Sequence, residues 1–528
     1  MSLPRFFDRA ADAITPVTDV DRDTLARRLN GVTVALHAEG LLADTAAGTA
    51  QYLYAANLAA RLYPRLALTG PTGLVEAAAT LAMSINPSID LDVTGATTSG
   101  TIAPTVKVRL GGGISTGDGP VVHAAADGWN VHLDDAPASG GNRAAPTPFA
   151  ALAAAALAMG EAFRTVFAPE LGDRGRTGPQ PARLNLVTLG SPTSDVPLPA
   201  RFDPLDATLV GAGAVGQAAL HALRAADAVG HLTVVDPETV TLSNLQRYVL
   251  TSDADVGQHK TDLARRLFNG TNATIDPVTT RWGADQRTGP GHRTVLVALD
   301  SAAARLAVAA SLPDRAYNAW TQPADIGWSW HEQFGLTPCL ACLYYPDRPR
   351  ASTHELIADA LGQEPLRVLA YLVLGLPIST VPPGIPEVLT MPFTPDTPRW
   401  LQVSLLDDLI DSGKISRADA DRWAGHDIAS LYRDGICAGG ILNLRPAEAD
   451  AAAVVPLAHQ SAFAGIMLAL TAVIAANSAL REHRPGQATE ARLDMLRGWP
   501  QVLPRPRART RGCLCSDPDY LRQQDDAH

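Results

Sequence analysis

The chain has 528 residues, which is too long for a single ordinary core and predicts two or three domains. Hydrophobic residues make up 46% of it, and its formal net charge is −11 without a dense block of Lys and Arg. This composition indicates a globular protein and argues against nucleic acid or an acidic membrane surface as the main partner, because either would require positive charge.

The start of the chain, MSLPRFFDRAADAI, lacks the basic and apolar regions of a signal peptide, so we expect a cytoplasmic protein that does not act at a membrane. One later run, residues 462–476 (AFAGIMLALTAVIAA), is nearly all apolar. This run is short for a bilayer and has polar neighbours, and it therefore predicts a buried helix.

Two parts of the chain share a pattern of strand, glycine turn, helix and strand. In the first, RLALTG (65–70) precedes the helix LVEAAATLAM and the strand IDLDV; in the second, TLVG precedes an Ala-rich helix over 214–228 and the strand HLTVVD. Small-residue helices entered from a proline also recur, at 148–163 and 456–475. The repetition predicts two related α/β units, although alanine favours helices in unrelated proteins as well.

Less regular stretches separate these elements. Residues 95–146 are rich in Gly, Thr and Pro and predict loops and short strands, and the many prolines of 169–204 predict a surface connection into the second unit. From about residue 349 to 455 the pattern changes to short polar helices, such as ISRADADRWAGHDIASLYRDG. This last stretch is interpreted as an insertion in the second unit.

A glycine fingerprint, Gly211-x-Gly213-x-x-Gly216, follows an apolar strand and opens a predicted helix. In this context the glycines let the backbone approach phosphate oxygens, and the helix N-terminus presents free N–H groups to them. Asp236 ends the next strand, where its carboxylate can accept hydrogen bonds from ribose hydroxyls. Taken alone, the pattern is typical of an NAD-dependent enzyme.

The segments that follow carry more positive charge than a pyrophosphate bridge requires. Asn244, Arg247 and Lys260 come after Asp236 at the carboxyl side of the predicted sheet, and they indicate a triphosphate. Asp300 lies just beyond an apolar strand, where a carboxylate can hold Mg²⁺ against the phosphates. Ordinary surface charge is the alternative for each cation taken singly, but their clustering favours a phosphate site.

The segments GAGAVG, VVDPETVTLSNLQRYVLTSDADVGQHK and VALDSAAAR, in this order, resemble the adenylation domain of the superfamily of ubiquitin-activating enzymes, ThiF and MoeB. The resemblance implies ATP and Mg²⁺ as ligands. It places the loop from Gly211 to Gly216 under the phosphates, Asp236 on the ribose, Asn244, Arg247 and Lys260 on the phosphates, and Asp300 on the metal. The superfamily often has Gln where this chain has Tyr248, and we assign Tyr248 no role.

The resemblance also implies a reaction. The C-terminal carboxylate of a small ubiquitin-like protein attacks the α-phosphate of ATP, which gives an acyl-adenylate and pyrophosphate. Because the attacking and leaving groups are both anionic, aligned cations and Mg²⁺ are the main requirement, and no general base from the protein is needed.

Four of the five cysteines form two close-spaced pairs, Cys339 with Cys342 and Cys513 with Cys515. In a cytoplasmic protein such pairs indicate a metal site before a disulfide framework. Two pairs in these places commonly share one Zn²⁺ in the superfamily, so the resemblance implies structural zinc on four thiolates. The second pair is Cys-x-Cys rather than Cys-x-x-Cys, and four free buried thiols are the alternative.

Cys437 stands apart, in RDGICAGGI, where neighbouring glycines allow close approach of an acyl group. The catalytic cysteine of the superfamily lies between the first zinc pair and the final helix, so the resemblance implies that Cys437 attacks the adenylate, releases AMP and stores the acyl group as a thioester. A buried, inert cysteine is the alternative. His459 and Arg433 are candidates for lowering its pKa.

The resemblance implies an α/β chain with two Rossmann-like, ThiF-type adenylation folds that pair as an intramolecular pseudo-dimer. We expect residues 1–200 to form an inactive unit, because they lack the glycine loop and the SNLQR run. Residues 201–348 and 456–528 are expected to form the active unit with a zinc-binding tail, and residues 349–455 a mainly helical catalytic-cysteine insertion. Arg5 and Arg9 are candidates for an arginine that reaches ATP from the inactive unit.

We therefore expect an activating enzyme that adenylates a ubiquitin-like protein, holds it on Cys437 and passes it to a conjugating enzyme. The fused inactive unit and the insertion are similar to the activating enzymes of bacterial ubiquitin-like conjugation operons, including the Bil antiphage systems. Two alternatives stay open. One is a sulfur-carrier adenylyltransferase of the ThiF or MoeB type without a thioester step, and the other is a scaffold with a dead ATP site, against which the intact site residues argue.

Overall fold

The computed structural model divides the chain into two units, Met1–Tyr345 with Val455–His528, and Pro346–Val454. It describes residues 3–38, 45–93, 104–111, 119–134, 144–203, 206–284, 288, 291–322, 325–344, 417, 455–497 and 502–527. Apart from residues 417 and 455, the predicted insertion, including Arg433 and Cys437, lies outside the described residues. Its helices and its catalytic role stay predictions.

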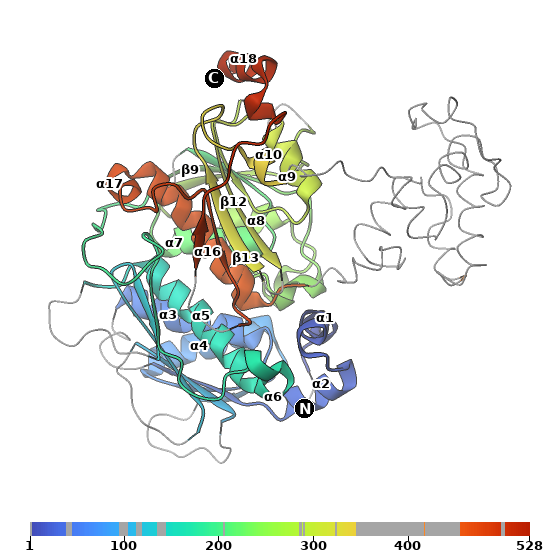
Figure 1. The fold of residues 1–528 in the computed structure, drawn as a ribbon. Helices are drawn as coiled ribbons and strands as arrows, with labels where there is room; N and C mark the ends of the chain where they lie inside the picture. Colours follow the sequence, from blue (N-terminus) through green and yellow to red (C-terminus); the bar gives the residue numbers. More distant parts are fainter. Residues whose placement is uncertain are drawn as a thin grey trace, which may run out of the picture. The chain divides into compact units, whose positions relative to one another are not determined.

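The first unit contains two sheets, and the N-terminal one has seven strands in the order β3-β2-β1-β4-β5-β6-β7. The pairs from β3 to β5 are parallel, and β6 and β7 continue the sheet antiparallel. The strands are β1 (Val34–Ala38), β2 (Arg65–Thr69), β3 (Asp90–Asp92), β4 (Val106–Leu110), β5 (Val121–Asp127), β6 (Asn130–Leu133) and β7 (Ala182–Asn185). Their helices, blue to teal in Figure 1, are α1 (Phe7–Thr18), α2 (Arg22–Asn30), α3 (Ala46–Ala60), α4 (Thr72–Ile85), α5 (Pro148–Val166) and α6 (Ala168–Leu171).

The second sheet has eight strands in the order β10-β9-β8-β11-β12-β13-β14-β15, parallel from β10 to β12 and antiparallel beyond. The strands are β8 (Ala207–Val210), β9 (Gly230–Val235), β10 (Ala273–Val278), β11 (Thr294–Val297), β12 (Arg315–Gln322), β13 (Asp325–His331), β14 (Glu490–Leu493) and β15 (Leu503–Arg505). The helices are α7 (Ala214–Ala225), α8 (Lys260–Leu267), α9 (Ala302–Ala309), α10 (Leu340–Tyr344), α16 (Ala458–Ala476), α17 (Ser478–Arg481) and α18 (Pro518–Ala527), with the short 3₁₀ turns η3 (Leu242–Gln246), η4 (Asp253–Asp255) and η8 (Leu514–Ser516). The predicted α/β class with Rossmann-like, mainly parallel sheets is confirmed.

The two sheets repeat one strand order when β1 is matched with β8, β2 with β9 and so on to β7 with β14. The match of RLALTG with TLVG is therefore wrong by one strand, because RLALTG forms β2, whereas the place of β8 is taken by β1. In the sequence, a single glycine, Gly40, stands between β1 (VALHA) and α3. The β2–α4–β3 segment therefore has a clearer strand, glycine turn and helix pattern than β1 and α3. The proline-rich stretch 169–204, predicted as a connection, also contributes the edge strand β7.

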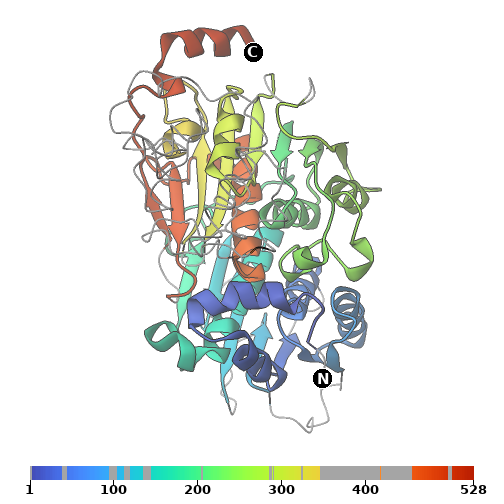
Figure 2. The ribbon, with the colours of Figure 1, turned by 90° about the vertical axis from the view of Figure 1, so that its right-hand side faces the viewer.

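The two predicted small-residue helices, α5 and α16, are confirmed. They occupy matching positions in the chain, since α5 lies between β6 and β7 and α16 lies between β13 and β14. α16 packs against both α7 and α5, so it joins the elements of the two sheets (Figures 1 and 2). A Cβ added to Gly465 would lie 2.3 Å from the carbonyl oxygen of Val215, which explains why α16 carries a glycine where it meets α7. Both helices are long and apolar enough to cross a bilayer, but 94% and 100% of their most apolar windows are buried inside the fold.

Candidate active site

The loop between β8 and α7 requires glycine at two of its three fingerprint positions. Gly211 has φ +97°, and a Cβ there would lie 2.6 Å from the carbonyl oxygen of Ala298. A Cβ on Gly216 would lie 2.0 Å from the carbonyl oxygen of Gly211. Gly213 is the N-cap of α7, so the unpaired N–H groups of the helix begin directly after it. The loop therefore has the backbone of an anion-binding turn.

Asp236, directly after β9, fixes this loop. Its Oδ2 accepts a hydrogen bond of 2.7 Å from the Ala212 N–H, and its Oδ1 accepts one of 2.9 Å from the Glu238 N–H. Burial raises the pKa of Asp236, and Lys260 together with these two N–H groups opposes the rise. Each carboxylate oxygen keeps a further lone pair, so the predicted bond to a ribose hydroxyl is compatible with this arrangement.

Lys260 is the buried cation of the site. It begins α8, is 2% exposed, forms an ion pair with Glu238 and donates to the hydroxyl of Tyr248 at 3.2 Å. Burial alone would lower the pKa of Lys260, but Tyr248, Asp236 and Glu238 outweigh it and raise the pKa. The side chain is therefore a fixed ammonium group beside the glycine loop.

Arg247 follows η3 and is partly buried. Burial lowers the pKa of Arg247, Tyr248 and Asp300 oppose this shift, and Arg9 adds to it. Asp300 and Arg9 are thus close enough to act on this guanidinium, and Asp300 is itself exposed after β11. Arg247, Asp300 and Lys260 come from three separate segments at the carboxyl ends of the central strands, as the sequence predicts.

Asn244 has a local capping role beside the phosphate contact that the sequence predicts. Its Oδ1 accepts a 3.0 Å hydrogen bond from the Thr241 N–H and so caps η3. The side-chain amide N–H₂ remains the group that can donate to a phosphate, because an Asn amide has separate donor and acceptor ends.

Asn57 lies on α3, and Arg61 directly follows this helix of the N-terminal half. Both residues hold the 245–251 segment in place, and the sequence analysis missed both. Arg61 is fully buried, and its guanidinium donates to the carbonyl oxygens of Leu245 at 2.5 Å and Thr251 at 2.9 Å. Asn57 donates to the carbonyl oxygen of Val249 at 2.9 Å and accepts from Arg61 at 2.8 Å. These bonds reach residues on both sides of Arg247 and Tyr248 in the chain. No local sequence pattern around residue 60 predicts them.

Arg305 supports Asp300 in a similar way. It is 8% exposed and donates to the carbonyl oxygens of Leu299 and Ala319. The bond to Leu299 anchors the backbone directly before Asp300. This arginine ends the run VALDSAAAR, so the sequence itself contained a signal for its place near the site.

The two candidate arginines of the N-terminal segment differ in their surroundings. Arg5 is paired with Asp253 of η4 at 3.0 Å. Arg9 lies on α1, which packs against η3, and it acts on the Arg247 guanidinium. Both arginines are paired, since Arg9 also lies 3.5 Å from a carboxylate oxygen of Asp12, and Arg9 differs from Arg5 in its electrostatic effect on Arg247.

The predicted metal ligands come together. Cys339, Cys342, Cys513 and Cys515 are all buried, and their four sulfurs lie within 4.8 Å of one another. The Sγ–Sγ distances are 3.6 Å for Cys339–Cys513 and 3.5 Å for Cys342–Cys515, near the edge of about 3.8 Å in a tetrahedron with Zn–S bonds of about 2.3 Å. Hydrogen bonds among the four thiols lower the pKa of Cys342 and Cys515 and raise the pKa of Cys339 and Cys513. The cluster can therefore hold a tetrahedral zinc ion.

Purified protein is expected to contain one zinc ion per chain, measured by elemental analysis. Cys339→Ser should lose the metal and lower the melting temperature, because the free energy of binding structural zinc contributes directly to folding. Cys437→Ser serves as the control and should keep its zinc. Full metal loss in Cys437→Ser, or unchanged zinc and stability in Cys339→Ser, would contradict a four-cysteine zinc site.

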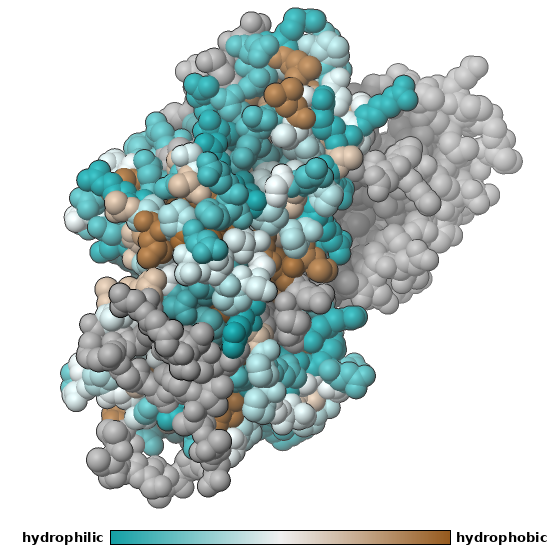
Figure 3. Space-filling view, turned by 60° about the vertical axis from the view of Figure 1, so that its left-hand side comes forward, coloured by the Kyte–Doolittle hydropathy of each residue, from teal (hydrophilic) through white to brown (hydrophobic). Residues whose placement is uncertain are grey.

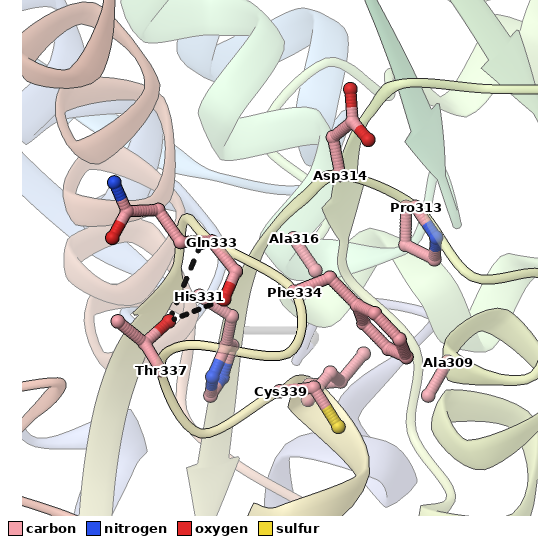
Figure 4. A pocket seen from close by; sticks show the side chains of 10 residues that line it. Ala309, Pro313, Asp314, Ala316, His331, Gln333, Phe334, Thr337 and Cys339 are labelled. Carbon is pink, nitrogen blue, oxygen red and sulfur yellow. Dashed lines mark hydrogen bonds between the residues drawn. The ribbon is translucent and has the colours of Figure 1, made fainter. Parts of the chain in front are cut away.

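A hollow beside Cys339 is too small for a substrate. Its volume is about 10 Å³, which is room for about one water molecule. Figure 4 shows Phe334 and His331 beside it, with Thr337 hydrogen-bonded to the backbone of Gln333. The hollow belongs to the packing around the cysteine cluster and lies apart from the glycine loop.

His459, a candidate for activating Cys437, lies in the buried interior of the fold. It is 5% exposed, its ring lies 5.8 Å from that of Phe163, and burial lowers its pKa to about 3. A histidine with this pKa is neutral at pH 7. Its effect on Cys437, which lies outside the described residues, stays a prediction.

Comparison with known proteins places the same residues in a known group. Residues 203–482 match the model of the ThiF family. Over 544 aligned residues the chain is 32% identical to the uncharacterized protein y4jF of Sinorhizobium fredii, covering 99% of this chain and 96% of that protein. Molybdopterin-synthase adenylyltransferase of Salmonella typhimurium is 44% identical over 101 residues, 18% of this chain and 40% of the relative. SAMP-activating enzyme E1 of Haloferax volcanii is 44% identical over 75 residues, 14% of this chain and 27% of the relative.

Proposed function

Because the chain belongs to the ThiF family, we propose that it is an ATP-dependent adenylyltransferase that activates the C-terminal carboxylate of a small ubiquitin-like or sulfur-carrier protein. The superfamily predicted from the segments between Gly211 and Arg305 is thereby confirmed. The observation that carries the proposal is the arrangement of Lys260 and Arg247 around the ring of Tyr248, whose hydroxyl lies beside Gly213 at the N-terminus of α7.

The geometry supports the first half-reaction. A carboxylate oxygen of the carrier attacks the α-phosphorus of ATP, the bond from that phosphorus to the β-bridging oxygen breaks, and pyrophosphate leaves. Lys260 and Arg247 would neutralise the phosphates, and Asp236 would accept from the ribose. Asp300 would hold Mg²⁺, which when bound shields the charge of the leaving pyrophosphate.

We propose that residues 1–200, which contain the seven-stranded sheet, form an inactive adenylation fold that completes a pseudo-dimer within the chain. Its support is the repeated strand order together with the absence of the glycine and SNLQR motifs from its sequence. We favour Arg9 over Arg5 as the arginine that residues 1–200 contribute, because Arg9 lies on α1, which packs against η3, and acts on Arg247.

The finer proposal is that Cys437 receives the activated carrier. Its thiolate would attack the adenylate carbonyl, a thioester would form, and AMP would leave. The carrier would then pass to a conjugating enzyme, in a cytoplasmic bacterial ubiquitin-like conjugation pathway of the antiphage type. Support comes from the position of Cys437 in the sequence, between the two cysteine pairs.

The thioester step is tested with ATP-Mg and a ubiquitin-like protein encoded beside the gene, by non-reducing mass analysis. We expect an adduct that dithiothreitol removes and that Cys437→Ala cannot form, while the variant still makes the adenylate. A carrier capped with AMP without any adduct on the wild-type protein would reject the thioester step and indicate a sulfur-carrier adenylyltransferase instead.

The carrier and the conjugating enzyme need a docking surface. On the face shown in Figure 3 hydrophobic residues form separate groups among hydrophilic ones. The large hydrophobic side chains most exposed among the described residues are Leu336 at 76% and Val93 at 51%. Leu336 follows β13 of the eight-stranded sheet, and Val93 follows β3 of the seven-stranded sheet. Hydrophobicity on this face therefore does not single out one partner site.

A further inference from the structure

Tyr248 lies between the two cations of the nucleotide site. The Arg247 guanidinium carbon is 5.6 Å and the Lys260 Nζ 5.0 Å from the centroid of its ring, distances at which a cation is attracted to an aromatic ring. The ring is 6% exposed. One aromatic side chain thus keeps two like charges next to each other at the same end of the sheet.

The hydroxyl of Tyr248 is turned toward the glycine loop. A Cβ added to Gly213 would lie 3.4 Å from this hydroxyl oxygen. Gly213 caps α7, whose first N–H groups have no partner within the helix. The phenol and Lys260 therefore lie beside the N-terminus of α7, which is where the proposed function puts phosphate.

The hydrogen-bond pattern leaves the phenol one donor. An ammonium group can only donate, so the 3.2 Å contact with Lys260 uses the Tyr248 oxygen as acceptor. Within the described part of the chain, no group accepts from the phenolic O–H. A buried hydroxyl proton beside two cations is suited to an anionic acceptor, because hydrogen bonds to charged groups are the stronger ones.

We propose that Tyr248 is a further phosphate-binding residue, which donates its O–H to a phosphate oxygen of ATP while its oxygen keeps Lys260 in place. The inference rests on the proposed function. The backbone of Tyr248 is itself held in position, since its carbonyl oxygen accepts from Thr251 and the flanking carbonyl oxygens of Leu245 and Val249 accept from Arg61 and Asn57. A small displacement of this segment would therefore move the hydroxyl away from the loop.

Tyr248→Phe removes the hydroxyl and keeps the ring. Its affinity for ATP-Mg, measured by calorimetry on the full chain, should fall about 10- to 100-fold, the range expected for losing one hydrogen bond to a charged group. Affinity for adenosine, which has no phosphate, should not change. Tyr63→Phe is the matched control, because Tyr63 is 1% exposed and its hydroxyl has no hydrogen-bond partner among the described residues.

The outcomes separate this proposal from the one it rests on. If wild-type protein binds ATP-Mg and Tyr248→Phe binds it equally well, Tyr248 is not a phosphate ligand and the proposed function stands. If ATP and adenosine weaken together, Tyr248 supports the fold of the site instead of contacting phosphate. If the wild-type protein does not bind ATP-Mg at all, the proposed function itself fails.

Discussion

Lys260→Ala is expected to slow adenylate formation by about 100- to 1000-fold, the size of effect found when one preorganised charge-stabilising group is removed from an active site. The buried ammonium group stands beside the glycine loop, next to Tyr248 and Glu238, and no other lysine can replace it there among the described residues. The measurement is exchange of labelled pyrophosphate into ATP in the presence of the carrier protein.

Arg265→Ala is the matched control, because Arg265 stands on the same helix, α8, has a side chain 64% exposed and pairs with Asp262. Its exchange rate should equal that of the wild-type protein. A Lys260→Ala variant with normal melting temperature and normal exchange would show that the site does not use this cation for phosphate.

Arg61→Ala is expected to impair the nucleotide site, although Arg61 follows α3 in the N-terminal half of the chain. It leaves the buried carbonyl oxygens of Leu245 and Thr251 without their donor, which costs about 1–3 kcal/mol for each unsatisfied group. The free energy of unfolding should fall accordingly. Exchange activity should fall about 100-fold, because the segment that bears Arg247 and Tyr248 loses its support and small misplacements of catalytic groups are costly.

Thermal unfolding and pyrophosphate exchange are measured together on Arg61→Ala, Asn57→Ala and Arg27→Ala. Arg27 is exposed on α2 and donates only to Thr24 among the described residues, so its replacement should change neither property. Asn57→Ala removes the bond to Val249 and should have a weaker effect of the same kind. Full activity in Arg61→Ala would show that the N-terminal sheet does not position the 245–251 segment.

The sequence predicted the fold where local pattern and tertiary structure agree. The α/β class and the helices α5 and α16 followed from strand patterns, glycine turns and small-residue runs. The match between the halves failed at β1, because no glycine directly follows VALHA, whereas Gly70 directly follows the RLALT strand of β2. Domain limits and the inactive role of the N-terminal unit stay predictions.

In the site, too, residues of one local motif could be predicted, whereas contacts between distant segments could not. Gly211, Asp236 and Lys260 belong to one sequence motif, so the motif alone was enough to predict that they are neighbours. Arg61 meets Leu245 only because α3 packs near η3, although the two residues are 184 positions apart in the chain. Tyr248 was given no role because it departs from the superfamily's usual residue, and only its contacts with Lys260 and Gly213 reveal a place in the site.

The central claim, ATP-dependent activation of a carrier protein's C-terminus, is tested most directly by intact-mass analysis of the purified carrier after incubation with the protein and ATP-Mg. We expect an AMP adduct on the carrier that requires its C-terminal carboxylate and disappears with Lys260→Ala, with pyrophosphate released in equal amount. ATP-Mg that binds without forming an adduct on any ubiquitin-like or sulfur-carrier protein tested, or an adduct that survives loss of Lys260, would contradict it.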